Sequence, residues 1–159
     1  MSVLSKSCVY GLRATLYVAG FGADRKFVPI REISTELGLS FHFLTKILQQ
    51  LTEAGLLESY RGPNGGIALA RDAGKISLLD IVKAIDGDAL FESCILGLAR
   101  CSGAHPCPLH ETWGKQRDEL AAALKRTSLG SLSAPVLNEE LCLRDKPKPQ
   151  AARRKTRGR

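Results

Sequence analysis

The sequence has no run of apolar residues close to the ~20 that a membrane-spanning helix needs. Its N-terminus lacks a basic flank, an apolar core and a small-residue cleavage site in that order, so we expect no signal peptide. Aromatic residues make up 6% of the 159 residues, and there is one tryptophan and one methionine. We therefore expect a soluble cytoplasmic chain that forms one globular domain and has no contact with a membrane. In that compartment thiols stay reduced, and clustered cysteines more often bind metal or react with oxidants than form structural disulfides.

The net charge of +7 is concentrated at the C-terminus. Residues 144–159 contain eight Lys or Arg and one Asp, whereas residues 1–143 contain fifteen basic and fifteen acidic residues. The tail has no apolar residue larger than alanine, a composition typical of disordered segments. A nucleic-acid-binding role for the remainder must therefore be argued from local patches.

The first half of the chain predicts three helices followed by a hairpin. Apolar residues recur at helical spacing in 5–20, in a helix that begins at Pro29 and ends at Gly38, and in a third helix from Ser40 to about 54. Two strands, 56–60 and 67–71, flank the turn sequence RGPNGG. A helix-turn-helix followed at once by a hairpin indicates a winged helix. The fold class we expect is mainly α with a small β-wing, extended by a long dimerisation helix.

The second half predicts a short helix over 77–85 and a longer one over 108–126. Leu109, Trp113, Leu120 and Leu124 form an apolar seam on the longer helix, which suits a dimer partner or, alternatively, packing onto its own domain. We divide the chain into a winged helix-turn-helix domain (1–86), a cysteine-rich loop (87–107), a dimerisation helix region (108–134) and a basic tail (135–159).

Seven polar residues are the candidate DNA contacts. Those on the third helix point away from its apolar stripe, and those in the wing lie at its tip. They are Arg31, Ser40, His42, Thr45, Lys46, Arg61 and Asn64. Arg25 and Lys26, in the linker before the second helix, could also meet phosphates.

The sequence is similar to the IscR/NsrR family of bacterial winged-helix regulators over residues 2–132. The likeness rests on LSKSCVYGLRATLYVA, on FLTKILQQLTEAGLLESYRGPNGGIALAR, and on three spaced cysteines behind the wing. The resemblance implies a homodimer that binds palindromic promoter DNA and carries an iron–sulfur cluster near the dimer helix. It implies the ligands Cys94, Cys101, Cys107 and His110, and favours [2Fe–2S] over [4Fe–4S].

The match to the family's ligand pattern is uneven. The gaps between the cysteines hold six and five residues, where cluster-bearing relatives usually have five in each. The acidic residue that some relatives supply from the partner's first helix is replaced here by Val9, next to Cys8. His110 is therefore the favoured fourth ligand, with Cys8 as a candidate donor from the partner subunit.

Other uses of the cysteines stay open. Three cysteines and a histidine also suit a tetrahedral zinc ion, although the close Cys-x-x-Cys pair typical of structural zinc is missing. Without metal, Cys101 and Cys107 could form a thiol switch. An enzyme in which His110 activates Cys107 is not expected, because nothing indicates an oxyanion hole or a pocket for a small-molecule substrate. His105 and Cys142 have no expected role.

The function predicted is a transcription regulator, a repressor in the first instance, that senses redox state, nitric oxide or iron–sulfur supply. The alternatives are a cluster-free regulator controlled by a thiol switch or a partner protein, and a zinc-stabilised interaction module.

Overall fold

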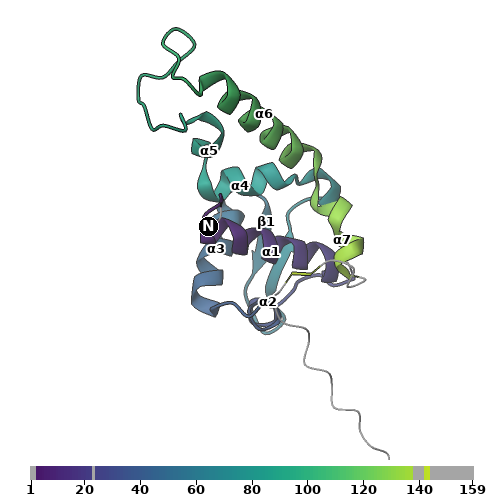
Figure 1. Cartoon of the computed structure of the whole chain (residues 1–159). Coiled ribbons are helices and arrows are strands. Elements are labelled where there is room, and N and C mark those ends of the chain that lie inside the picture. The colour runs from purple at the N-terminus through teal and green to yellow at the C-terminus, as the bar shows by residue number, and fades with distance from the viewer. Residues whose placement is uncertain (1–2, 23, 138–141, 144–159) are drawn as a thin grey trace, which may run out of the picture.

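A computed structural model describes residues 3–22, 24–137 and 142–143. The chain forms a helical body with a two-stranded sheet, and a helix that rises from this body carries the cysteine loop (residues 93–109) at its far end (Figure 1). No helix among the described residues is both long and apolar enough to cross a membrane.

The first three helices follow the predicted pattern. They are α1 (Lys6–Phe21), α2 (Ile30–Leu37) and α3 (Phe41–Glu53). Ser5 caps α1 by accepting a hydrogen bond from the backbone N–H of Cys8. Gly38 ends α2 in the left-handed conformation, with φ of 64°, which a residue without Cβ adopts at little cost. The tight turn between α2 and α3 is thus set by that glycine.

The hairpin consists of β1 (Leu57–Tyr60) and β2 (Gly66–Leu69), paired antiparallel with Leu57 opposite Leu69 and Tyr60 opposite Gly66. Val28 extends this small sheet by exchanging two backbone hydrogen bonds of 2.8 Å with Ile67. The segment before α2 is therefore tied to the wing.

The core lies where α1, α3, α4 and the hairpin meet. Its fully buried side chains include Ile33, Leu44, Leu51, Ile67 and Ile81. Helix α4 (Leu78–Asp86) follows a short 3-10 helix, η1 (Ala73–Lys75), and begins with a capping box formed by Ser77 and Asp80. The expected class, a mainly helical winged-helix fold with a small sheet, is confirmed.

The C-terminal half differs from the prediction in two places. A short helix, α5 (Ala89–Glu92), lies inside the segment 87–107 predicted to be a loop. After α6 (His110–Arg126) comes α7 (Leu129–Leu137), which the sequence analysis did not foresee and which packs against α1. Residue 135, where we divide the chain, lies within α7, which contains Pro135 and the buried Leu129 and Val136. The predicted disordered tail, residues 144–159, lies outside the described residues.

Candidate metal centre and DNA-binding face

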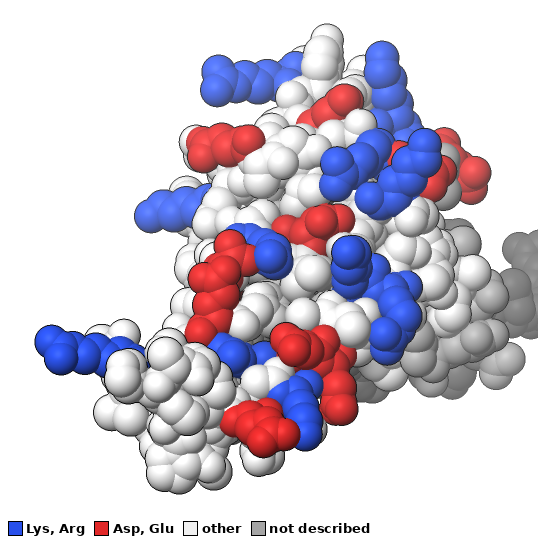
Figure 2. All heavy atoms as spheres, turned by 90° about the horizontal axis from the view of Figure 1, so that it is seen from above, with Lys and Arg blue, Asp and Glu red and all other residues white. Residues whose placement is uncertain are grey.

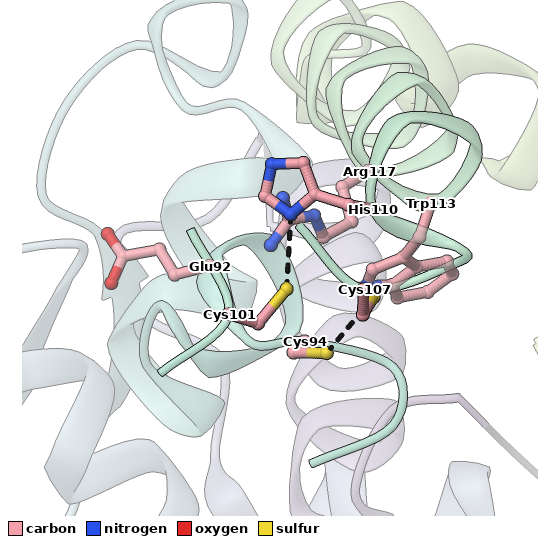
Figure 3. A pocket seen from close by; sticks show the side chains of 7 residues that line it. All are labelled: Glu92, Cys94, Cys101, Cys107, His110, Trp113 and Arg117. Carbon is pink, nitrogen blue, oxygen red and sulfur yellow. Dashed lines mark hydrogen bonds between the residues drawn. The ribbon is translucent and has the colours of Figure 1, made fainter. Parts of the chain in front are cut away.

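The three cysteines of the segment 94–107 reach one pocket from different points along the chain. Cys94 follows α5, Cys101 lies midway along the loop, and Cys107 stands just before α6. Gly97, with φ of 69°, supplies one of the bends. His110, the first residue of α6, completes the group (Figure 3). The loop thus returns on itself and brings residues 94 and 110 to one place.

The distances between these groups suit a shared ligand. The three Sγ atoms lie within 4.8 Å of one another, and the Sγ atoms of Cys94 and Cys107 are 3.7 Å apart. The Nδ1 of His110 is 3.1 Å from the Sγ of Cys101. All five cysteines of the chain are free thiols. The residues that line the pocket are Glu92, Cys94, Cys101, Cys107, His110, Trp113 and Arg117.

The surroundings act on these thiols in opposite directions. Backbone hydrogen bonds, first from Leu98 and then from Leu96, lower the pKa of the Cys94 thiol to about 7, because they stabilise its thiolate. Desolvation raises the pKa of the Cys107 thiol. The Cys94 thiol is therefore readily ionised. A bound cation would offset the desolvation that disfavours the thiolate of Cys107.

Cys8 does not share this arrangement. Its side chain is fully buried in α1, and burial, followed by the nearby Asp86 carboxylate, raises its pKa to about 12. A neutral, enclosed thiol is a poor donor to a partner subunit. His105, the other histidine of the loop, is exposed and does not line the pocket. His110 is the histidine that the fold places beside the three cysteines.

These residues fit an iron–sulfur cluster by the chemistry of the donor set. Thiolates with one imidazole are ligands that such clusters accept, and the pocket opens between a bent loop and a helix end. The same four donors also suit a tetrahedral zinc ion. The geometry therefore supports a metal centre and leaves its type open.

The candidate DNA contacts lie on α2, α3 and the hairpin turn. Arg31, Ser40, His42, Lys46, Arg61 and Asn64 are exposed, and Thr45 is half-buried. Ser40 precedes α3 without capping it through its side chain, so its hydroxyl is available to a ligand. The Thr45 hydroxyl instead donates to the Phe41 carbonyl at 2.8 Å. The side chains predicted to contact DNA thus face solvent, and Thr45 is the least accessible of them.

Two arginines near this face are held by neighbours. The guanidinium of Arg31 lies 5.3 Å from the centre of the Phe41 ring, a cation–π contact that fixes it beside the start of α3. Arg25 donates two hydrogen bonds of 2.9 Å to Glu32. Arg25 is therefore engaged within the protein and is a weaker candidate for a phosphate contact than Arg31.

The cysteine loop and the helix-turn-helix lie on different sides of the molecule (Figure 1). Figure 2 looks down on the molecule from the side of the cysteine loop, and there basic and acidic side chains are interspersed. Helices α2 and α3 lie at the opposite side of the body (Figure 1). The candidate metal centre and the candidate DNA-binding face are thus spatially separate.

Two residues of α6 that line the pocket, Trp113 and Arg117, were not predicted from the sequence to belong to it. Both donate hydrogen bonds to the carbonyl of Ser93, Trp113 through Nε1 at 2.9 Å and Arg117 through Nη1 at 3.1 Å. Their spacing from His110, three and seven positions along a helix, was the signal available, because such residues share one face. The sequence pattern instead predicts Trp113 to lie in the apolar seam of the dimer helix.

Comparison with known proteins agrees on one family. The model of the Rrf2 family, described as iron-dependent transcriptional regulators, matches residues 4–135. The transcriptional regulator IscR of Citrobacter koseri is 34% identical over 149 residues, which cover 93% of this chain and 88% of the relative.

Two solved structures share the fold. The structure of CymR, the global cysteine regulator of B. subtilis, is 27% identical with a TM-score of 0.71 and covers 84% of this chain and 98% of that one. The structure of IscR from T. potens has a TM-score of 0.67 at 24% identity, covers 87% of this chain and 91% of that one, and supports the fold alone.

Proposed function

This chain belongs to the Rrf2 family of transcriptional regulators, and on that premise we propose how its metal centre and its DNA-binding face work together. The resemblance to IscR-type regulators seen in the sequence is confirmed, and the chain is a regulator of transcription with a winged helix. We assign no catalytic role to its cysteines.

We propose that Cys94, Cys101, Cys107 and His110 hold an iron–sulfur cluster, of the [2Fe–2S] type in the first instance. The observation that carries this is the convergence of three thiols within 4.8 Å of one another, with an imidazole nitrogen 3.1 Å from one of them. A cluster bound there would supply a group that is redox-active and open to attack by small oxidants or nitric oxide.

The chain's own residues connect this site to the rest of the molecule. His110 opens α6, and Trp113 on the same helix holds the carbonyl that precedes Cys94. Helix α6 also packs against α4, which packs against α1 and α3. A change in the order of the cysteine loop can therefore shift the position of α6. Through α4 it can also shift α3, the helix proposed to enter the major groove.

The DNA-binding form is proposed to be a homodimer on a palindromic promoter site. In this arrangement His42, Thr45 and Lys46 meet base edges and phosphates in the major groove, while Arg61 and Asn64 at the wing tip contact the backbone. Ser40 and Arg31 stand at the N-terminal end of α3, where phosphates approach a helix dipole.

Anaerobic purification tests the metal site. We expect a coloured protein with matching iron and sulfide, and loss of that colour in Cys94→Ala, Cys101→Ala, Cys107→Ala and His110→Ala. Cys142→Ala is the matched control, because this thiol is exposed and distant in sequence from the loop. A colourless protein that contains zinc, or no metal, would overturn the cluster and favour a zinc site or a thiol switch.

A band-shift titration with the chain's own promoter tests the DNA-binding face. Arg61→Ala should weaken binding to specific and random DNA alike and reduce the salt slope by about one, as expected for a lost phosphate contact. His42→Ala should instead cost about 1–3 kcal/mol on the promoter alone, because base contacts carry sequence preference. The exposed Lys75 in η1 provides the control Lys75→Ala. Binding that is unchanged in both variants would contradict the proposed face.

A further inference from the structure

One face of α6 supplies three groups to the metal pocket. His110, Trp113 and Arg117 follow one another at helical spacing, and all three line the pocket (Figure 3). Trp113 and Arg117 both donate to the Ser93 carbonyl, which stands directly before the candidate ligand Cys94. These two donors occupy both lone pairs of this carbonyl and so fix its orientation.

The Arg117 guanidinium also has an unused donor. Its Nε is buried without a hydrogen-bond partner, and no other buried side-chain nitrogen or oxygen of the described residues shares this condition. Leaving a buried donor unpaired is costly, and a charged group makes the cost larger. Figure 3 shows the guanidinium directed toward His110 and Cys101 from α6. A positive charge with a free donor therefore faces a group of thiols.

We propose that Arg117 is a positioning residue for the metal group of this chain. Its Nη1 fixes the Ser93 carbonyl and with it the start of the ligand loop. Its Nε–H and its positive charge face the negative charge that accumulates when three thiolates bind metal. This inference rests on the proposed function, since it requires that the four ligands hold a cluster.

The two contributions have separable consequences. Fixing the loop should slow the loss of iron. Removing a residue that orients a metal ligand through hydrogen bonds commonly lowers metal affinity by about 10–100-fold. The positive charge should raise the reduction potential, since net charge and hydrogen bonds near the sulfurs set that potential. An electron added to the cluster increases its negative charge, and a nearby cation favours the reduced form.

Three variants separate these consequences in the full-length protein reconstituted with iron and sulfide. Arg117→Met removes the charge and the donors, Arg117→Lys keeps the charge, and Trp113→Phe removes only the other donor to the Ser93 carbonyl. Lys115→Met is the control, because Lys115 is an exposed cation on α6 that pairs with Glu111. The readouts are the rate of iron release to a chelator and the potential for uptake of one electron from an electrode.

We expect Arg117→Met to release iron about tenfold faster or more and to show a more negative potential than the wild type. Arg117→Lys should restore the potential and retain part of the faster release, while Trp113→Phe should affect release alone. The proposal is overturned if Arg117→Met matches Lys115→Met in both readouts, or if Trp113→Phe shifts the potential equally. A wild type that binds no iron and sulfide would overturn the proposed function as well, and that result is visible before any variant is made.

Discussion

At the scale of single residues, Gly66 shows how a missing side chain shapes the wing. A Cβ at this position would overlap the carbonyl oxygen of Val28 and lie 2.9 Å from the nitrogen of Pro29. Both obstacles are backbone, so a side chain cannot be accommodated by a change of rotamer. The close approach allows Val28 and Ile67 to exchange their two hydrogen bonds beside it.

We therefore predict that Gly66→Ala lowers the free energy of unfolding by about 1–3 kcal/mol, as overpacked sites do. Urea denaturation followed by circular dichroism measures this directly. Gly103→Ala is the matched control, because a Cβ there meets no atom within 4 Å. Equal stability of the two variants would show that the contact between the hairpin and the segment before α2 is looser than described.

At the scale of elements, Glu32 joins α1 to α2 and to the segment between them. It accepts two hydrogen bonds from Arg25 and one, at 2.9 Å, from the hydroxyl of Tyr17 in α1. The hydrogen bonds from Arg25 are the largest cause that lowers the pKa of this carboxyl, followed by that from Tyr17. The ionised form thus favours the folded chain.

The sign of this coupling predicts the pH dependence. A lowered folded-state pKa stabilises the protein above the ordinary glutamate pKa of 4.5, and the contribution is lost as the pH falls through the lowered value. We expect Glu32→Gln to be less stable than the wild type by about 0.5–1 kcal/mol at pH 7, a small effect because the pair is partly exposed. The difference should close toward pH 3 in urea denaturation. Glu58→Gln, at an exposed position of β1, is the matched control.

Elements were predictable where periodicity was strong. The apolar stripe of α3 and the Gly38 stop of α2 marked the helix-turn-helix, and RGPNGG marked the hairpin. Helix α7 was not predicted because LGSLSAPVL, with its Gly, Ser and Pro, has no clear helical pattern, whereas its packing against α1 and η1 appears only in the folded chain. The ligand spacing along the chain could suggest the metal residues. It could not show that Cys8 is enclosed or that Arg117 and Ser93 meet, since both depend on tertiary packing.

At the scale of the whole molecule, α6 is a helix that the described part of its own chain leaves largely uncovered. None of its residues is buried; Leu120 exposes 36% of its surface, and Leu109, directly before the helix, exposes 41%. The neighbouring cysteine loop exposes Ile95, Leu96 and Leu98 to about half. The indole of Trp113 donates a hydrogen bond to the Ser93 carbonyl of its own chain. Trp113 therefore contributes less to the predicted apolar seam of α6 than the sequence suggests. Apolar surface of this kind is typical of interfaces, and the proposed homodimer would cover it.

We predict that Leu120→Lys shifts the protein toward monomer, because a charge placed in an apolar interface loses its hydration without gaining a partner. Sedimentation velocity at micromolar concentration measures the shift, and affinity for the palindromic promoter should fall with it, since one protomer engages only one half-site. Asp118→Asn changes the net charge by the same amount on the opposite side of α6, two positions away, and should remain dimeric. A Leu120→Lys protein that stays dimeric and binds the promoter normally would place the dimer interface on another face and leave the exposed α6 residues for a different partner.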